Sequence, residues 1–123
     1  MKLYLLVALF GAIGSCLRFF LVQITPKISL LNFPVGTLIV NLLGSLLIGV
    51  VAGLFEKNFV TIETRTFMVF GFLGGFTTFS SFTFEFFNLL KNSDYINAFV
   101  YIFISVFLSL FLFFLSYKFF KIF

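Results

Sequence analysis

The chain has 123 residues, of which 62% are hydrophobic and 10% charged, and its formal net charge is +4. A water-soluble domain of this size covers its surface with polar side chains, and so few charges exclude that class. The chain has no His and a single cysteine, Cys16, inside an apolar run. The common metal-ligand and nucleophile clusters of enzymes are therefore absent, and we expect a membrane protein that is not an enzyme.

Four stretches have the length of about 20 apolar residues that a membrane-spanning helix needs. They are Leu3–Ile24, Phe33–Phe55, Thr66–Leu90 and Tyr95–Tyr117. Short polar or proline-containing segments separate them: Thr25-Pro26-Lys27, Glu56-Lys57-Asn58 and Lys91-Asn92-Ser93-Asp94. These loops are too short for a further domain. The sequence predicts an all-α membrane protein in which residues 1–123 form one transmembrane domain of four helices.

The cations predict the orientation by a narrow margin. An even number of spans puts both termini on one side, with Lys2, Lys57, Arg65, Lys118 and Lys121. Lys27 and Lys91 fall on the other side, and Arg18 falls within the first span. Because Lys and Arg favour the cytoplasmic side, we expect cytoplasmic termini in a bacterial inner membrane. The small margin leaves open insertion in both orientations, and with it an antiparallel dimer.

Polar side chains in hydrocarbon are costly unless they face protein or water, so their spacing is informative. In the second span small or polar residues recur every four positions, which places them on one helix face. They are Thr37, Asn41, Ser45, Gly49 and Gly53, and the fourth span repeats the pattern with Asn97, Tyr101, Ser105 and Ser109. Two interpretations stay open: a packing seam between helices, or a polar pathway.

The third span contains the segment that is least suited to a helix. Gly74, Gly75 and the hydroxyl-rich run after them disfavour a continuous helix at mid-span. A break there would free backbone carbonyls, which are good ligands for a hard cation. Phe79 and Phe82 share a face, and the positive edges of their rings could hold an anion. In a chain with 24 Phe, ordinary packing is the simpler explanation of this pair.

Charged residues within or beside the spans need a partner, a watery vestibule or access to the interface. Arg18 follows the small residues Gly11 and Gly14 in the first span. It fits either an anchor at the interface or a charge that attracts anions. Glu63 and Glu85 are predicted to lie at the interface.

Together these segments resemble the Fluc family of fluoride channels, also called CrcB proteins, over almost the whole chain. The resemblance rests on three motifs that occur in order: Gly11-Ala12-x-x-Ser15-x-x-Arg18-Phe19, Gly36-Thr37-Leu38-x-Val40-Asn41-x-x-Gly44 and Gly71-Phe72-x-Gly74-Gly75-x-Thr77-Thr78-Phe79-Ser80-Ser81-Phe82. The third motif is the most specific. One departure is Ser81, where family members commonly have Thr, and the hydroxyl group is kept.

The resemblance implies an antiparallel, dual-topology homodimer that encloses two separate pores for fluoride ions. Phe79 and Phe82 would be the aromatic pair that lines a pore, Asn41 the pore asparagine, and Arg18 a residue towards a pore entrance. The other residues of the implied fluoride pathway carry hydroxyl groups: Thr37, Ser80, Ser81, Tyr101, Ser105 and Ser109.

The resemblance also implies a structural Na⁺ at the dimer centre, bound by the backbone carbonyls of Gly74 and Thr77 and shared with the partner. The implied function is passive export of cytoplasmic fluoride, which reduces its toxicity. A proton-coupled exporter of the small multidrug-resistance type is the main alternative. That class requires a membrane-embedded Glu in the first span, and Leu3–Ile24 contains none. A membrane assembly protein, in which every polar stripe is packing, is the third reading.

Overall fold

The computed structural model describes residues 1–25 and 33–122. Four helical runs are long and apolar enough to cross a membrane: Lys2–Ile24, Val35–Glu56, Ile62–Lys91 and Tyr95–Ile122. They confirm the four predicted spans, although the fourth continues beyond Tyr117 to Ile122. Pro26 and Lys27, which were predicted to close the first span, lie outside the described residues.

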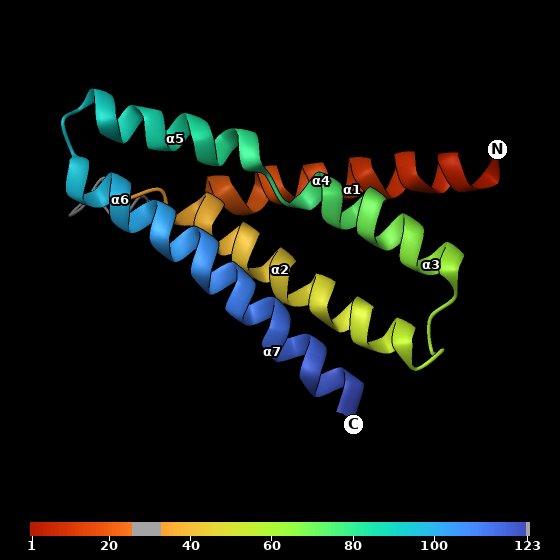
Figure 1. Cartoon of the computed structure of the whole chain (residues 1–123). Helices are drawn as coiled ribbons and strands as arrows, with labels where there is room; N and C mark the ends of the chain where they lie inside the picture. The colour runs from red at the N-terminus through yellow and green to blue at the C-terminus, as the bar shows by residue number, and fades with distance from the viewer. Residues whose placement is uncertain (26–32, 123) are drawn as a thin grey trace.

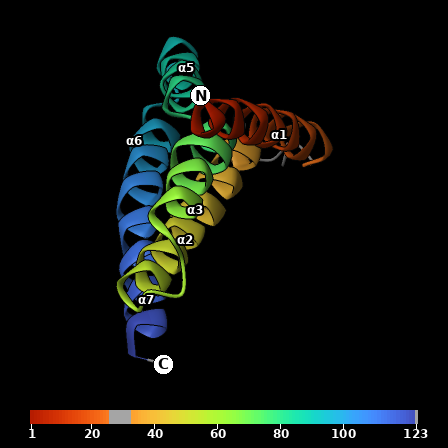
Figure 2. The ribbon, with the colours of Figure 1, turned by 90° about the vertical axis from the view of Figure 1, so that its right-hand side faces the viewer.

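The first two spans are uninterrupted helices, α1 (Lys2–Ile24) and α2 (Val35–Glu56). The chain passes back and forth along the molecule, so that both termini and the turn after α2 lie toward one end (Figure 1). In the view turned by 90°, α1 stands apart from α7 on the far side of α2 and α3 (Figure 2). This arrangement agrees with the even number of spans that the sequence predicts.

The third span consists of several segments and is bent. It begins with α3 (Ile62–Thr66), a π-helical segment η1 (Phe67–Leu73) and the short α4 (Gly74–Phe76). Thr77 and Thr78 then take extended backbone angles, with ψ of 156° and 120°, before α5 (Phe79–Lys91) begins. The predicted interruption is present, but Gly74 and Gly75 themselves are helical, and the helix ends after them.

The fourth span contains a π-helical turn that the sequence did not predict. It consists of α6 (Tyr95–Phe103), the π-turn η2 (Ile104–Leu108) and α7 (Ser109–Ile122). Before the turn α6 packs against α5, and after it α7 packs along α2. The π-turn therefore lies where this span changes its neighbour.

The pair α2 and α7 forms the most extensive helix contact of the described chain, and the two helices run side by side in both views (Figures 1 and 2). A Cβ atom on Gly49 would lie only 2.3 Å from the backbone oxygen of Phe113. Ser116 Oγ donates a hydrogen bond of 2.8 Å to the Leu46 carbonyl. The C-terminal half of the small-residue stripe on α2, from Gly49 to Gly53, is therefore a packing seam.

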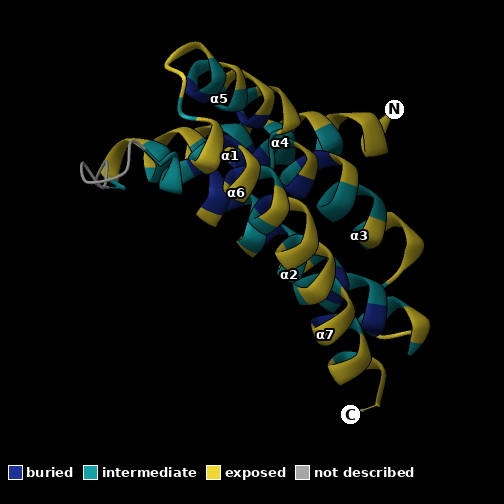
Figure 3. Ribbon diagram, turned by 60° about the vertical axis from the view of Figure 1, so that its left-hand side comes forward, coloured by how far each residue is buried: buried dark blue, intermediate teal, exposed yellow. Residues whose placement is uncertain are grey.

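Buried residues lie where helices meet, whereas residues on the outward faces are exposed (Figure 3). One buried hydrophobic cluster joins α2, α5 and α6, and it consists of Leu38, Phe82, Leu89, Ala98 and Tyr101. Many large apolar residues are exposed on the outside of this chain. Such surfaces are stable against lipid or another apolar protein face and not against water.

Candidate functional site

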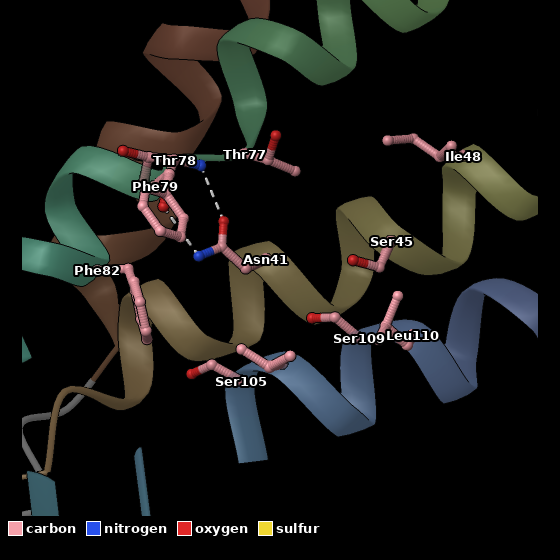
Figure 4. Close-up of a pocket in the computed structure, with 11 residues that line it drawn as sticks. Asn41, Ser45, Ile48, Thr77, Thr78, Phe79, Phe82, Ser105, Ser109 and Leu110 are labelled. Carbon is pink, nitrogen blue, oxygen red and sulfur yellow. Dashed lines mark hydrogen bonds between the residues drawn. The ribbon is translucent and has the colours of Figure 1, made fainter. Parts of the chain in front are cut away.

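The interruption of the third span is fixed by an asparagine from the second. The Thr78 amide donates to Asn41 Oδ1 at 2.8 Å, and Asn41 Nδ2 donates to the Thr78 carbonyl at 3.0 Å (Figure 4). One side chain thus satisfies both backbone groups of a residue that has left the helix, as a neighbouring sheet strand would. Asn41 was predicted to line a pore, and the structure shows its side chain bonded to the broken backbone.

The interruption leaves backbone carbonyls without their helical donors. The amide that would normally bond to Gly74 O is that of Thr78, which is bonded to Asn41 instead. The Ser81 amide, which would bond to Thr77 O, donates to Thr78 Oγ1 at 3.2 Å. Neither carbonyl receives a hydrogen bond from residues 1–25 or 33–122. These two oxygens are available to an external ligand, and a hard cation is the natural one.

The carbonyl between these two positions is held by the first span. Arg18 Nε donates to Gly75 O at 3.1 Å, and Ser15 Oγ donates to the same oxygen at 3.4 Å. The C-terminal end of a helix carries partial negative charge, so a cation at this place is stabilising. Arg18 therefore makes a defined contact at the end of α4, which neither of the two sequence interpretations included.

A cavity of about 360 Å³ lies beside the interruption, and we call it the Asn41 cavity. It is open on one side, and five of the residues predicted for the anion path line it: Asn41, Phe79, Phe82, Ser105 and Ser109. Ser45 and the two threonines of the extended link also contribute. In Figure 4 the Asn41 side chain points from α2 toward Thr78, and Ser105 and Ser109 come from the fourth span. Asn41 and Ser45 of the α2 stripe thus border a cavity whose lining is mostly apolar but includes an amide and several hydroxyl groups.

The aromatic pair sits at one side of this cavity. The ring centroids of Phe79 and Phe82 are 5.3 Å apart, and Phe82 lies 5.2 Å from the Tyr101 ring. Phe82 is 8% exposed, whereas Phe79 is 77% exposed. The Phe82 ring is buried in the core, and the Phe79 ring projects from the surface, where lipid or protein would touch it.

A second cavity, of about 420 Å³, collects the remaining polar residues on the side of the first span. Its predicted members are Arg18, Thr37, Ser80 and Ser81. Tyr101 borders neither cavity: it is fully buried, and its hydroxyl donates to Glu85. The sequence-predicted path is therefore divided between two cavities, with Tyr101 packed between the aromatic pair and Glu85.

Glu85 is the polar residue whose role sequence reasoning missed. Its two carboxylate oxygens accept hydrogen bonds of 2.7 Å from Thr37 Oγ1 and 2.6 Å from Tyr101 OH. It was predicted only to lie at the interface, and the structure shows that it is partly buried and lines the second cavity. A signal was available, because Glu85 follows Ser81 and Phe82 by four and three residues, which places the three on one face of α5.

These features define a class of protein before any comparison is made. Four apolar helices, an interrupted third span and polar cavities beside the interruption are typical of a multi-pass membrane protein with a pathway for small polar or charged solutes.

Comparison with known proteins identifies the family. The model described as "CrcB-like protein, Camphor Resistance (CrcB)" matches residues 5–117, and the chain belongs to this family. A relative from Thermus thermophilus is 47% identical over 118 residues, which cover 96% of this chain and 94% of the relative. One from Rhizobium etli is 44% identical over 107 residues, 86% of each chain. Both are named fluoride-specific ion channel FluC, so the family consists of channels and not of multidrug exporters or enzymes.

Proposed function

We propose that this chain is a fluoride-selective channel that works as an antiparallel pair of copies in the bacterial inner membrane. It would let cytoplasmic fluoride leave the cell passively and so reduce its toxicity. The observation that carries the proposal is the Asn41 cavity. An amide, two serine hydroxyls and an aromatic pair converge there, beside a helix interruption, in a family whose relatives bear the name of fluoride channels.

The chemistry of the cavity suits a small anion. Fluoride is strongly hydrated, so a selective path has to replace its water with hydrogen-bond donors in a narrow space. Ser105 and Ser109 offer O–H donors, and the edges of Phe79 and Phe82 offer weak positive potential without a full charge. No fixed carboxylate lines the Asn41 cavity. An anion there would meet no direct repulsion from its walls.

The exposed faces of the protomer support a second copy. The Asn41 cavity is open on one side, and the Phe79 ring projects from the surface beside it. The hydroxyl groups in this mostly apolar cavity would lose hydrogen bonds to water if they faced hydrocarbon, so a protein surface that closes the cavity would be favourable. We propose that the closing surface belongs to an inverted copy, which the narrow charge margin between the two sides of the sequence would permit.

A structural Na⁺ is part of the proposal. The carbonyls of Gly74 and Thr77 receive no hydrogen bond from the described chain, and both residues lie at the interruption. Two carbonyl oxygens alone leave most of the coordination shell of a hard cation unfilled. The same pair from an inverted copy would double the number. The cation would then join the two copies at their interrupted helices.

Flux from liposomes tests the function. Purified protein should release fluoride rapidly and chloride hardly at all, without a proton gradient. Drug-dependent proton movement would contradict a channel, and protein that carries no ion would leave only a packing or assembly role.

A further inference from the structure

Gly44 of α2 faces the interruption of the third span and leaves no room for a side chain. It is buried, and a Cβ atom there would lie 2.1 Å from Cγ2 of Thr77 and 3.6 Å from the Phe76 ring. Side-chain atoms in close-packed interiors do not approach each other to 2.1 Å. The methyl group of Thr77 therefore rests on the backbone of α2, in the place where the side chain of a larger residue would lie.

The amide and the hydroxyl of Thr77 are fixed as well. The amide donates to the Leu73 carbonyl at 2.9 Å, and Oγ1 donates to the same oxygen at 2.8 Å. With the hydroxyl bonded to Leu73 and the methyl group packed against Gly44, the branched side chain is held in one rotamer. The Thr77 carbonyl, in contrast, accepts no hydrogen bond from the part of the chain that the structure describes.

The direction of that carbonyl is also set by α2. The peptide group between Thr77 and Thr78 is trans, so its N–H and its C=O point in opposite directions. The N–H donates to Asn41 Oδ1 at 2.8 Å, and the carbonyl therefore points away from the Asn41 side chain. Asn41 and Gly44 are three residues apart and share one face of α2. In Figure 4 Thr77 and Thr78 lie beside this part of the helix.

We propose that Gly44 is a positioning residue for the cation site: it seats the Thr77 methyl group and so aims the Thr77 carbonyl at the ion that joins two copies. A cation binds more tightly to an oxygen that is already in place, because the oxygen does not have to be ordered on binding. This inference rests on the Na⁺ that is part of the proposed function. It adds to that site a residue that does not itself touch the ion.

Transfer of one methyl group across this contact tests the inference. Gly44→Ala adds a methyl group where there is no room for it. Thr77→Ser removes the methyl group that it would meet and keeps the hydroxyl that bonds to the Leu73 carbonyl. The double variant has the same number of methyl groups in the same space. Each variant is purified as the full chain, and the fraction of dimer is measured over a series of Na⁺ concentrations, with a large organic cation as replacement.

We expect Gly44→Ala to raise the Na⁺ concentration that maintains half of the dimer by about tenfold, because overpacking displaces the Thr77 carbonyl. Thr77→Ser alone should raise it less, and the double variant should lie closer to the wild type than Gly44→Ala does. A folded Gly44→Ala variant with the wild-type Na⁺ dependence would overturn the inference. So would a double variant that needs as much Na⁺ as Gly44→Ala. A wild-type dimer that does not respond to Na⁺ would instead remove the proposed cation site itself, and this inference with it.

Gly49→Ala is the matched control, because a Cβ atom there would also lie 2.1 Å from a side-chain atom, Ser116 Oγ, but in the seam between α2 and α7. It should lower the free energy of unfolding and leave the Na⁺ dependence of the dimer unchanged. An equal shift in Gly49→Ala and Gly44→Ala would show that the Na⁺ dependence reports only general stability, and would overturn the inference.

The Thr77→Ser background keeps the inference testable if Gly44→Ala alone does not fold. In this background, addition of Gly44→Ala should bring the required Na⁺ concentration back toward that of the wild type, because the new methyl group fills the space that the lost one has left. A further rise in the required Na⁺ concentration would overturn the inference.

Discussion

At the scale of single residues, the two members of the aromatic pair differ in their surroundings. Phe82 is 8% exposed and packs against Tyr101, whereas Phe79 is 77% exposed. The same substitution should therefore affect them differently: Ile keeps apolar volume at either position but removes the ring edge.

We predict that Phe79→Ile and Phe82→Ile both lower fluoride flux at least tenfold in liposomes. Only Phe82→Ile should also lower the free energy of unfolding, by about 1–2 kcal/mol, because the Phe82 ring fills the core. Flux and denaturant-induced unfolding are measured on the same preparations. Unchanged flux in a still-dimeric protein would refute the role of the ring edges.

Asn41 is predicted to act on the backbone first and on the anion second. Asn41→Ala removes two hydrogen bonds to Thr78, so we expect a loss of about 2–4 kcal/mol in unfolding free energy together with loss of flux. Ser45→Ala is the control, because Ser45 lines the same cavity one turn later and no hydrogen bond of its side chain to the described chain is seen. Stability equal in the two variants would contradict the backbone role.

Two substitutions of Arg18 separate the effect of its hydrogen bond to Gly75 from the effect of its positive charge. Arg18→Lys keeps the positive charge but loses the Nε donor that bonds to Gly75 O. If the contact matters, Arg18→Lys should lower flux nearly as much as Arg18→Gln, and added salt should change both variants alike. A lysine variant with wild-type flux would favour the anion-attracting role instead.

At the scale of elements, the length of the spans could be predicted and their irregularities only in part. Apolar length alone located the four helices, because the bilayer requires it. The interruption was predicted from glycine and hydroxyl content, but its position after Phe76 depends on Asn41, which captures the Thr78 amide from another helix. Local helix propensity cannot predict a contact with a different helix. The π-turn η2 includes neither glycine nor proline and gave no signal.

The candidate site shows the same limit. The four-residue spacing placed Asn41 on one face of the second span and Ser105 and Ser109 on one face of the fourth, and all three line one cavity in the structure. The spacing alone could not separate the part of the α2 stripe that packs against α7, at Gly49, from the part that lines the cavity. A packing stripe and a polar pathway both repeat every four residues.

The contact between α2 and α7 gives a prediction for these elements. A methyl group on Gly49 would lie 2.1 Å from Ser116 Oγ, so Gly49→Ala should cost about 1–3 kcal/mol of unfolding free energy through overpacking. At Gly11 the nearest atom would be 3.7 Å away, an ordinary contact, and Gly11→Ala should be close to neutral. Denaturant titration of both variants checks the difference. An unchanged free energy of unfolding for Gly49→Ala would show that α2 and α7 accommodate the added methyl group at little cost.

At the scale of the whole molecule, the proposed Na⁺ would bind where two copies meet. Exhaustive removal of Na⁺, with a large organic cation as replacement, should abolish fluoride flux and weaken the dimer. Re-addition of Na⁺ should restore both the flux and the dimer, because the proposed ligands are backbone carbonyls of the unchanged protein. Flux that persists without Na⁺ would argue against the site at Gly74 and Thr77.

The open side of the Asn41 cavity has a consequence for the living cell. A single copy in the bilayer would leave a cavity that contains polar groups open toward acyl chains, and pairing would relieve this. Under the proposed pairing, the number of working channels at low abundance grows with the square of the amount of protein synthesised. Fluoride tolerance of a host should therefore rise more steeply than in proportion to expression, until most copies are paired.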